Sequence, residues 1–402
     1  MKLTQISSAC ALAATMLMGT SAQAQFSGDV VRIGFITDMS GLYADIDGPA
    51  GAEAIRMAIA DMGGTLAGKK IELLVADHQN KADVAAAKAR EWFDQQGVDM
   101  LIGGSNSGTA LAMAKVAAEK KKPFMSVGAG TSALTNEQCS PYTVHYAYDT
   151  TALAKGTAPA VVKAGGKSWF FLTADYAFGT ALQADATTAV KGAGGSVVGS
   201  VRAPLASSDF SSFLLQAQSS KAQILGLANA GGDTINSIKA ANEFGITKSM
   251  KLVGLLMFIN DVHSLGLKAT QGMYLTDSWY WNQSPESRAW SKRFFDKFKR
   301  MPSSLQAADY SVTQFYLNAL KAANTDDGDK ALEQMRNSKV NDMYAKGGYI
   351  RADGTMVHDM YLMQVKTPAE STTPWDYYKV IATTKGEDAF TTKAETRCAA
   401  WK

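Results

Sequence analysis

The chain has 402 residues, of which 46% are hydrophobic and 19% charged, with a formal net charge of +3. Its length is well above that of a single typical domain, so two lobes are expected. The basic residues are scattered. Their densest group, EKKK at 119–122, suits the end of a helix, where cations stabilise the helix dipole. This charge pattern disfavours a nucleic-acid-binding function.

Residues 1–24 have the pattern of a cleavable export signal. Lys2 provides a positive start, an apolar run too short to span a bilayer follows, and Ala22-Gln23-Ala24 forms a small-x-small cleavage motif. Cleavage before Gln25 would release a soluble periplasmic protein. Cys10 raises the alternative of a lipid anchor, but it precedes the apolar run instead of following it.

From residue 30 onward, short β-type runs alternate with helical segments. Ile55, Ile59 and Met62 recur at helical spacing after Pro49, which suits a first helical turn. Strands that alternate with helices of this length predict a parallel sheet built from βαβ units. In this first series, strands are predicted at 30–37, 70–77, 98–104 and 123–128, and helices are predicted from about 49, at 83–97 and at 108–121.

The pattern restarts after HYAYDTTALAKG at 145–156, which predicts a second doubly wound lobe and a crossover between the two. The last third is less regular, and its Asp353-Gly354 pair favours a tight hairpin turn. The second series places strands at 168–175, 197–203, 222–229 and 250–256, and helices at 179–195, 210–220 and 233–245. In the last third, helices are predicted at about 285–299 and 306–323, followed by strands within VHDMYLMQVK and WDYYKVIAT.

Two cysteines, Cys139 and Cys398, remain once Cys10 leaves with the signal. Two cysteines in an oxidising compartment usually pair, so a disulfide between them is expected. It would tie the C-terminal tail to a loop in the first third of the chain. Two separate thiols are the alternative.

Five loops follow predicted strands, at the sheet edge where open parallel sheets bind ligands. They are small, rich in hydroxyl groups and poor in charge. Hydroxyls and the N–H groups of helix N-termini stabilise an anion, so a carboxylate fits these loops without a metal or a lysine. The loops read TDMSGLYADIDGPAG, IGGSNSGT, VGAGTSALT, TADYAFGT and LANAGGDT.

Other chemistries find little support. No P-loop motif occurs, and GAGTSA at 128–133 is a lone dinucleotide-type match in an exported chain. Ser105 and Ser107 lack the spacing of a nucleophile elbow, which disfavours a hydrolase.

Asp45 and Asp47 could bind a cation or act as acid and base, although loop aspartates more often cap turns. The four histidines are scattered, which argues against a catalytic base and a zinc site: His78, His145, His263 and His358. We therefore expect a binding protein, not an enzyme, with no cofactor and no metal.

Five segments in a fixed order carry a resemblance to a known family. They are IGFITDMSGLYADIDGPAGAEAIRMAI, ELLVADHQNKADVAAAKAREW, VDMLIGGSNSGTALAMAKVAAE, PFMSVGAGTSALTNE and LTADYAFGTAL. With them, the chain resembles the periplasmic solute-binding proteins of ABC transporters, in particular the branched-chain amino acid (Leu/Ile/Val-binding) family. The resemblance covers essentially the whole mature chain.

This resemblance implies a type I periplasmic binding fold, which has two Rossmann-like, doubly wound parallel-sheet lobes joined by a three-strand hinge. The N-terminal lobe would comprise 26–146 and 276–355, and the C-terminal lobe 147–275 and 356–402. A ligand would be enclosed when the lobes close about the hinge. The implied partner is an ABC permease at the inner membrane, and the protein itself would be a monomer.

The family's ligand-holding positions fall on polar and aromatic residues of this chain. The carboxylate side is implied at Ser105, Asn106, Ser107, Ala129, Gly130 and Thr131. The second lobe is implied to contribute Tyr176 and Phe178, with Asn229, Ala230 and Gly231 from the loop after QILGLA. An apolar remainder would comprise Leu256 and Met257, with Tyr43 and Tyr148.

One departure from the family bears on the ligand. Amino-acid binders of this family place an acid after the strand that matches KLVGLL, where it pairs with the ligand's ammonium group. Here that position is about Leu256, and no acid follows before Asp261. An enclosed ammonium without a partner is costly, so an aromatic acid is the preferred ligand. If Asp47 or Asp149 takes the role of that acid, a branched-chain or other amino acid is the alternative. A ligand-binding sensor of the same fold is a further alternative.

Overall fold

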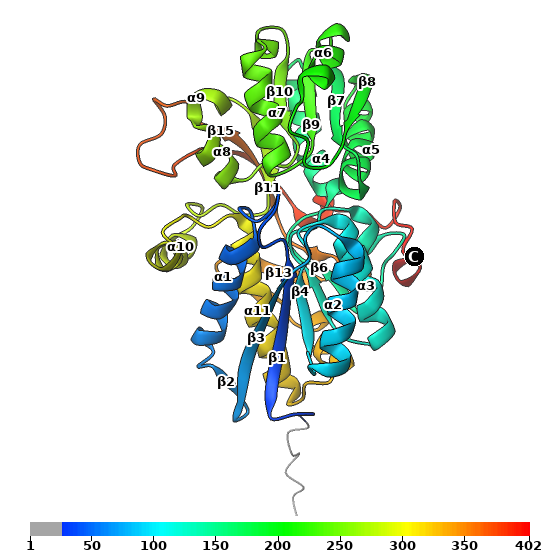
Figure 1. The fold of residues 1–402 in the computed structure, drawn as a ribbon, viewed down its shortest axis with the longest axis vertical. Coiled ribbons are helices and arrows are strands. Elements are labelled where there is room, and N and C mark those ends of the chain that lie inside the picture. The colour runs from blue at the N-terminus through cyan, green and yellow to red at the C-terminus, as the bar shows by residue number, and fades with distance from the viewer. Residues whose placement is uncertain (1–25) are drawn as a thin grey trace, which may run out of the picture.

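The computed structural model describes residues 26–402, which form two α/β lobes stacked along the long axis of the molecule (Figure 1). The predicted export signal at 1–24 lies outside the described residues. The chain builds the sheet of one lobe up to β6 (Thr143–His145) and then the sheet of the other. This arrangement confirms the predicted pair of doubly wound lobes.

The first lobe contains a six-stranded sheet in the order β2-β3-β1-β4-β5-β6. All neighbours in it are parallel except β2 and β3, which form a short antiparallel pair. Hydrophobic runs buried on both faces explain the central strands, since helices cover both sides of the sheet. The remaining strands are β1 (Val30–Thr37), β2 (Thr65–Leu66), β3 (Lys69–Asp77), β4 (Met100–Gly103) and β5 (Phe124–Ser126), and the helices are α1 (Gly48–Asp61), α2 (Ala82–Gln95) and α3 (Ser107–Lys120).

The second lobe contains a four-stranded parallel sheet in the order β10-β9-β7-β8. Its strands are β7 (Ser168–Ala174), β8 (Ser196–Ala203), β9 (Ile224–Ala228) and β10 (Lys251–Gly254). Its helices are α4 (Thr150–Lys163), α5 (Ala177–Gly192), α6 (Ser211–Ser219), α7 (Gly232–Glu243), α8 (Ile259–Leu265) and α9 (Leu267–Thr270). Strand β10 ends two residues before the predicted limit of 256, so Leu255 and Leu256 belong to the loop that follows.

The last third of the chain completes both lobes. Two predicted helices occur as α10 (Pro285–Phe298) and α11 (Ser304–Ala323), whereas α12 (Gly328–Arg336) was not predicted. The predicted Asp-Gly turn joins β13 (Lys346–Ile350) to β14 (Met356–Val357), with Gly354 at φ +91°. A separate sheet in the order β11-β15-β16 packs against α4 of the second lobe. The other elements are β11 (Tyr274–Asp277), β12 (Val340–Asn341), β15 (Met360–Val365), β16 (Tyr378–Thr384) and α13 (Gly386–Ala389).

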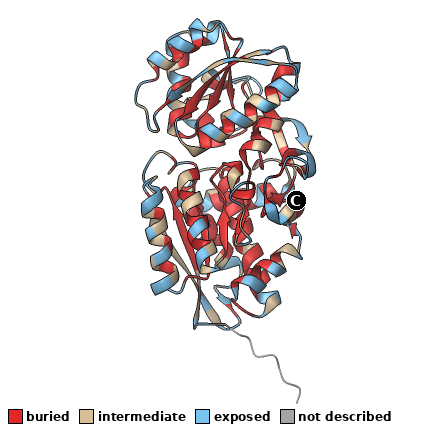
Figure 2. Ribbon diagram, turned by 90° about the vertical axis from the view of Figure 1, so that its right-hand side faces the viewer, coloured by how far each residue is buried: buried red, intermediate tan, exposed pale blue. Residues whose placement is uncertain are grey.

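Buried residues concentrate on the sheets and on the inner faces of the helices (Figure 2). One apolar cluster extends from Phe35 in the first sheet, through Tyr43 and Phe178, to Trp169 in the second sheet. The lobes therefore meet through continuous side-chain packing at the cleft. Within residues 26–402, no helix combines the length and apolar character needed to cross a membrane, and no group of His, Cys, Asp and Glu could hold a metal ion.

The predicted disulfide is confirmed. Cys139 and Cys398 are bonded across a sequence separation of 259 residues. The bond holds the C-terminal tail against the loop that follows the 3₁₀ turn Ser132–Thr135. Arg397 reinforces it, because its backbone N–H donates to Asn136 Oδ1 at 2.5 Å and its guanidinium pairs with Glu137.

Candidate ligand-binding site

Asp38 shapes the loop that carries Tyr43 into the cleft. It lies directly after β1, and its carboxylate accepts hydrogen bonds from the backbone N–H groups of Gly41 at 2.7 Å and Tyr43 at 2.8 Å. Asn80 Nδ2 also donates to it at 2.5 Å. A loop aspartate that binds several backbone donors fixes a turn. Tyr43 is thereby fixed in a buried position at the end of the first sheet.

The loop IGGSNSGT turns sharply between β4 and α3. Gly103 and Gly104 have φ of +117° and +76°, and a Cβ at Gly103 would lie 2.6 Å from the Ile36 carbonyl oxygen. Asn106 then caps α3 by accepting from the backbone of Gly108 at 2.8 Å. The turn brings Ser105 and the first helical residue, Ser107, to the cleft.

The hydroxyls of these two serines accept from backbone groups of the protein. Ser105 Oγ accepts from the Asp38 N–H at 3.2 Å, and Ser107 Oγ accepts from the Thr131 N–H at 3.2 Å. A hydroxyl that accepts a bond still has its own proton to donate. Both serines line the cleft, so each can donate to an anion there.

The loop VGAGTS forms the floor of the cleft. The Gly128 carbonyl accepts from the Tyr148 hydroxyl at 2.8 Å, and the Ala129 carbonyl bonds with His145 Nε2 at 2.6 Å. Gly130 allows the second lobe to approach closely, because a Cβ there would lie 2.8 Å from the Phe178 ring. Burial lowers the pKa of His145 to about 4, so this ring is neutral and structural.

The second lobe closes the cleft with aromatic and apolar side chains. Tyr176 and Phe178 lie at the start of α5, and the Tyr43 and Tyr176 hydroxyls are 2.6 Å apart. Two further bonds join the loop that carries Tyr43, after β1, to the second lobe. The Gly232 N–H donates to the Leu42 carbonyl at 3.4 Å, and Asn260 Nδ2 donates to the Asp45 carbonyl at 3.1 Å. The lobes are thus held together directly across the cleft.

A small cavity lies where these segments converge. It has about 10 Å³ of free space, which is room for about one water molecule. Among the described residues that line it, none is charged. The structure brings together nine of the predicted residues: Tyr43, Ser105, Ser107, Gly130, Tyr148, Tyr176, Phe178, Ala230 and Leu256. Ile46 and Gly128 complete the lining and were missed, because an isoleucine between two aspartates and a glycine in a glycine-rich loop give no distinct signal.

Six other predicted residues lie outside the cavity wall, and most have a local structural role. Asn106 caps α3, Thr131 Oγ1 accepts from the Ala133 N–H at 3.4 Å, and the Ala129 carbonyl holds His145. Asn229 Oδ1 accepts from Thr234 Oγ1 at 2.8 Å within the loop before α7. The last two are Gly231, which packs on Leu42 and Tyr43, and Met257, which is buried in the second lobe's own core.

A pair of buried carboxyl groups lies behind the floor of the cleft. Asp47 Oδ2 accepts from Thr37 Oγ1 at 2.5 Å, and Asp309 on α11 faces it. A Cβ at Gly51 would touch both carboxyl groups, at 2.4 and 2.6 Å. Burial raises the pKa of Asp47 to about 6, and burial together with the nearby Asp47 charge raises that of Asp309 much further. The pair therefore shares a proton at neutral pH, with Asp309 as the protonated member.

The two other candidate acids have structural roles. Asp261 Oδ2 accepts from the Phe258 N–H at 2.8 Å, which caps α8, and Asp149 Oδ1 accepts from the Ala152 N–H at 2.7 Å, which caps α4. Burial raises the pKa of each to about 7. Neither lines the cavity, whereas Leu256 does.

The sequence and the fold of the chain are similar to those of known proteins. A family model described as periplasmic binding protein matches residues 30–372. A periplasmic binding protein of Burkholderia mallei is 69% identical with a TM-score of 0.92, over 93% of this chain and 100% of that one. A branched chain amino acid ABC transporter periplasmic ligand-binding protein of Burkholderia xenovorans LB400 is 39% identical with a TM-score of 0.83, over 92% and 100%.

A third structure is that of an ABC transporter solute binding protein from Rhodopseudomonas palustris BisB5, solved in complex with 3,4-dihydroxy benzoic acid. It is 25% identical with a TM-score of 0.81, over 89% of this chain and 98% of that one. The fold, the interlobe cleft and the family match agree, and the chain belongs to the periplasmic binding protein family as the ligand-binding component of an ABC transporter.

Proposed function

We propose that the cleft binds a small aromatic carboxylate and that the protein, exported to the periplasm as a monomer, delivers this ligand to an ABC permease at the inner membrane. The observation that carries the proposal is the chemistry of the cavity wall. Two serine hydroxyls, four aromatic rings and Leu256 line the same cavity, and no lining residue among those described is charged.

The serine side of the cavity supports the carboxylate group. Ser105 and Ser107 each accept one backbone hydrogen bond and retain a proton for a ligand. Ser107 is also the first residue of α3, where the helix dipole favours a negative charge. Neutral donors keep binding reversible, because no protein charge has to be desolvated.

The apolar part of the cavity wall supports an aromatic body. Phe178, Tyr148 and Leu256 are buried and line the cavity, and planar rings pack well against aromatic and aliphatic groups. The small volume of the cavity favours a small ligand. It also requires the rings to shift, or the lobes to open, when the ligand enters. The R. palustris relative that binds 3,4-dihydroxy benzoic acid provides a precedent for this ligand class on the same fold.

An amino acid is the competing ligand. The more similar B. xenovorans protein is the ligand-binding protein of a branched chain amino acid ABC transporter, and the carboxyl group of Asp47 lies close behind the floor. Its Oδ2 would lie 3.6 Å from a Cβ at Gly128. Asp47 is already engaged by Thr37 and Asp309, however, and does not line the cavity. An enclosed ammonium would therefore lack a direct partner, at a cost of several kcal/mol.

Titration calorimetry at pH 7 with benzoate, 4-hydroxybenzoate, leucine and valine tests this proposal. We expect heat of binding with at least one aromatic acid and none with the two amino acids. If leucine or valine binds and the aromatic acids do not, the argument from Leu256 is wrong and the amino-acid alternative stands.

The variant Ser107→Ala tests whether the carboxylate of the ligand binds at Ser107. Loss of a hydrogen bond to a charged group costs about 1.5–3 kcal/mol, so aromatic-acid affinity should fall roughly 10- to 150-fold. Ser291→Ala is the matched control, because Ser291 is equally buried but lies on α10, away from the cavity lining. Equal affinities in both variants would place the anion elsewhere.

A further inference from the structure

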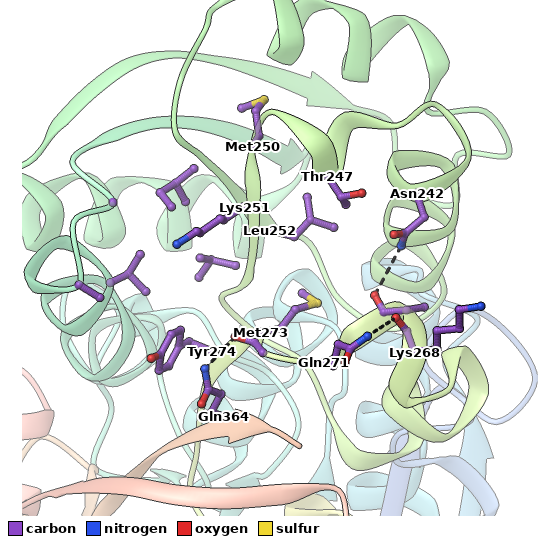
Figure 3. A pocket seen from close by; sticks show the side chains of 17 residues that line it. Asn242, Thr247, Met250, Lys251, Leu252, Lys268, Gln271, Met273, Tyr274 and Gln364 are labelled. Carbon is purple, nitrogen blue, oxygen red and sulfur yellow. Dashed lines mark hydrogen bonds between the residues drawn. The ribbon is translucent and has the colours of Figure 1, made fainter. Parts of the chain in front are cut away.

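A second cavity lies in the second lobe, away from the cleft (Figure 3). It has a volume of about 520 Å³ and shares no lining residue with the cleft cavity. Ligand pockets in proteins commonly measure about 300–1,000 Å³, so this cavity is large enough for a small organic molecule. It lies between the C-terminal end of α4, strands β10 and β11, and helix α9.

The cavity exists because two strands diverge. Strand β10 forms the edge of its sheet and pairs with β9, whereas β11 pairs with β15 in another sheet. Lys251 N–H donates to the Gln223 carbonyl at 2.9 Å, on the β9 side. Backbone groups alternate sides along a strand, so the N–H and C=O groups of Leu252 face away from β9. In the part of the chain that the structure describes, no strand pairs with this outer edge of β10.

The lining is amphipathic and carries positive charge only. Its apolar part includes Val161, Ile224, Met250, Leu252 and Met273, and its polar part includes Asn242, Lys251, Lys268, Gln271 and Gln364. No acidic residue is among the lining residues, and within residues 26–402 neither lysine has an ion-pair partner. Gln271 and Gln364 each use one amide N–H on a backbone carbonyl and retain a second one, whereas Asn242 Nδ2 donates to the carbonyls of both Ile238 and Ala269.

The two lysines are placed differently. Figure 3 shows the two side chains pointing in opposite directions: the ammonium group of Lys251, an exposed residue, extends toward other lining side chains, whereas that of Lys268 points away from them. An anion in the cavity would therefore meet Lys251, with the amide of Gln364 from the neighbouring strand.

We propose that this cavity is a second ligand site, which takes an amphipathic organic monoanion: an alkyl or aryl chain with one carboxylate or sulfonate. The chain would bury its apolar surface against the Met, Leu and Ile side chains, which drives binding by about 25 cal/mol per Å². The anionic head would pair with Lys251 at the mouth. The proposal is independent of the ligand in the cleft. It also differs from strand addition to β10, because that strand has only four residues and α9 lines the cavity next to it.

The probe is 8-anilinonaphthalene-1-sulfonate, an amphipathic monoanion whose fluorescence rises in apolar surroundings. We expect saturable binding to the full mature protein, with displacement by decanoate. Lys251→Gln should weaken dye affinity about threefold, in line with a solvent-exposed ion pair, whereas Lys268→Gln should change it less than about twofold.

Ala164→Phe tests the position of the dye directly. Ala164 is exposed and lines the cavity from the end of α4, so the new ring fills the cavity without disturbing the core. We expect dye affinity to fall about tenfold while the thermal unfolding midpoint stays unchanged. Unchanged affinity in Ala164→Phe, or equal effects of the two lysine variants, would overturn the proposal. Displacement of the dye by an extended peptide but not by decanoate would overturn it in favour of strand addition to β10.

Discussion

Tyr43 and Tyr176 form a direct polar contact between the lobes. Their hydroxyls are 2.6 Å apart, and both side chains line the cleft cavity. Burial raises the pKa of both, so both are neutral and one donates to the other. This bond exists only when the lobes meet, and it therefore stabilises the closed arrangement relative to an open one.

Tyr176→Phe removes this bond and keeps the ring. A net loss of about 0.5–1.5 kcal/mol from the closed state should weaken ligand affinity roughly 2- to 13-fold, mainly through faster dissociation. Stopped-flow release of the bound ligand measures this. Tyr377→Phe is the control, because its hydroxyl bonds with His263 Nδ1 at 2.8 Å and does not line the cleft. Equal release rates in the two variants would contradict the role of the tyrosine pair.

The Asp47–Asp309 pair makes stability depend on pH. The native pKa of Asp47 is raised to about 6 and that of Asp309 is raised further, whereas an unfolded aspartate has a pKa near 3.8. The pair's contribution is fully present below about pH 4 and is lost as pH rises through the raised values. We expect the free energy of unfolding to fall by at least about 1.4 kcal/mol between pH 5 and pH 8 from this pair, which is the contribution of one pKa unit.

Asp309→Asn should reduce this pH dependence, because an amide can donate to Asp47 without binding a proton. Urea unfolding at pH 5, 6.5 and 8 measures it. Asp209→Asn is the control, since hydrogen bonds from Ser211 lower the pKa of this exposed carboxyl and it stays ionised over the whole range. An unchanged pH profile in Asp309→Asn would show that the two carboxyl groups do not share a proton.

At the residue scale, local patterns predicted much of the site. Ser105 and Ser107 could be predicted because small polar residues directly after a strand face the edge where ligands bind. The partner of Asp47 could not be predicted in this way. Asp309 lies 262 residues further along the chain on a mostly buried helix, and nothing in its local pattern indicates that α11 packs on α1.

At the element scale, most strands and helices of the first two-thirds followed from periodicity, because buried parallel strands and their helices repeat regularly. Elements there that were not predicted include β6, α4 and α8. The last third was harder to predict. Its elements β12 and β14 have two residues each, which is too short for any periodic pattern, and they are ordered by tertiary pairing with β13. The short polar helix α12 was missed for a related reason, since it packs on α11 through only a few buried positions.

The Cys139–Cys398 bond joins a loop and the C-terminal tail, which lie far apart in the sequence. It closes a loop of 259 residues and holds the tail beside the 3₁₀ turn that begins at Ser132, next to the cleft. The double variant Cys139→Ser, Cys398→Ser should lower the free energy of unfolding by about 2–5 kcal/mol, because a long loop is no longer constrained in the unfolded chain. Urea unfolding without reductant measures it. Equal stability of the variant and the oxidised wild type would show that the packing of the tail is sufficient by itself.

At the scale of the whole molecule, the lobes are joined by direct contacts at the cleft, and the cavity between them has about 10 Å³ of free space. A ligand of benzoate size cannot enter such a space unless the lobes separate or the aromatic side chains that line it move. The polar contacts that would have to break include the tyrosine pair, the bonds to the Leu42 and Asp45 carbonyls, and the bond from Ser132 Oγ to Asp185 Oδ2. Opening on a hinge would break these polar bonds together with the apolar packing around Tyr43 and Phe178 at the cleft.

We therefore expect an open state to be populated without ligand. Small-angle X-ray scattering should give a larger radius of gyration for the ligand-free protein than the closed arrangement predicts, and saturating ligand should reduce it to the closed value. Ligand stabilises the closed state only to the extent that it binds that state more tightly, so the reduction should follow the binding isotherm. In Tyr176→Phe, half of the reduction in the radius of gyration should be reached at a higher ligand concentration, while the radius at saturation should stay the same. A radius that equals the closed value before ligand is added would mean that entry occurs through side-chain motion at Tyr43 and Phe178, without separation of the lobes.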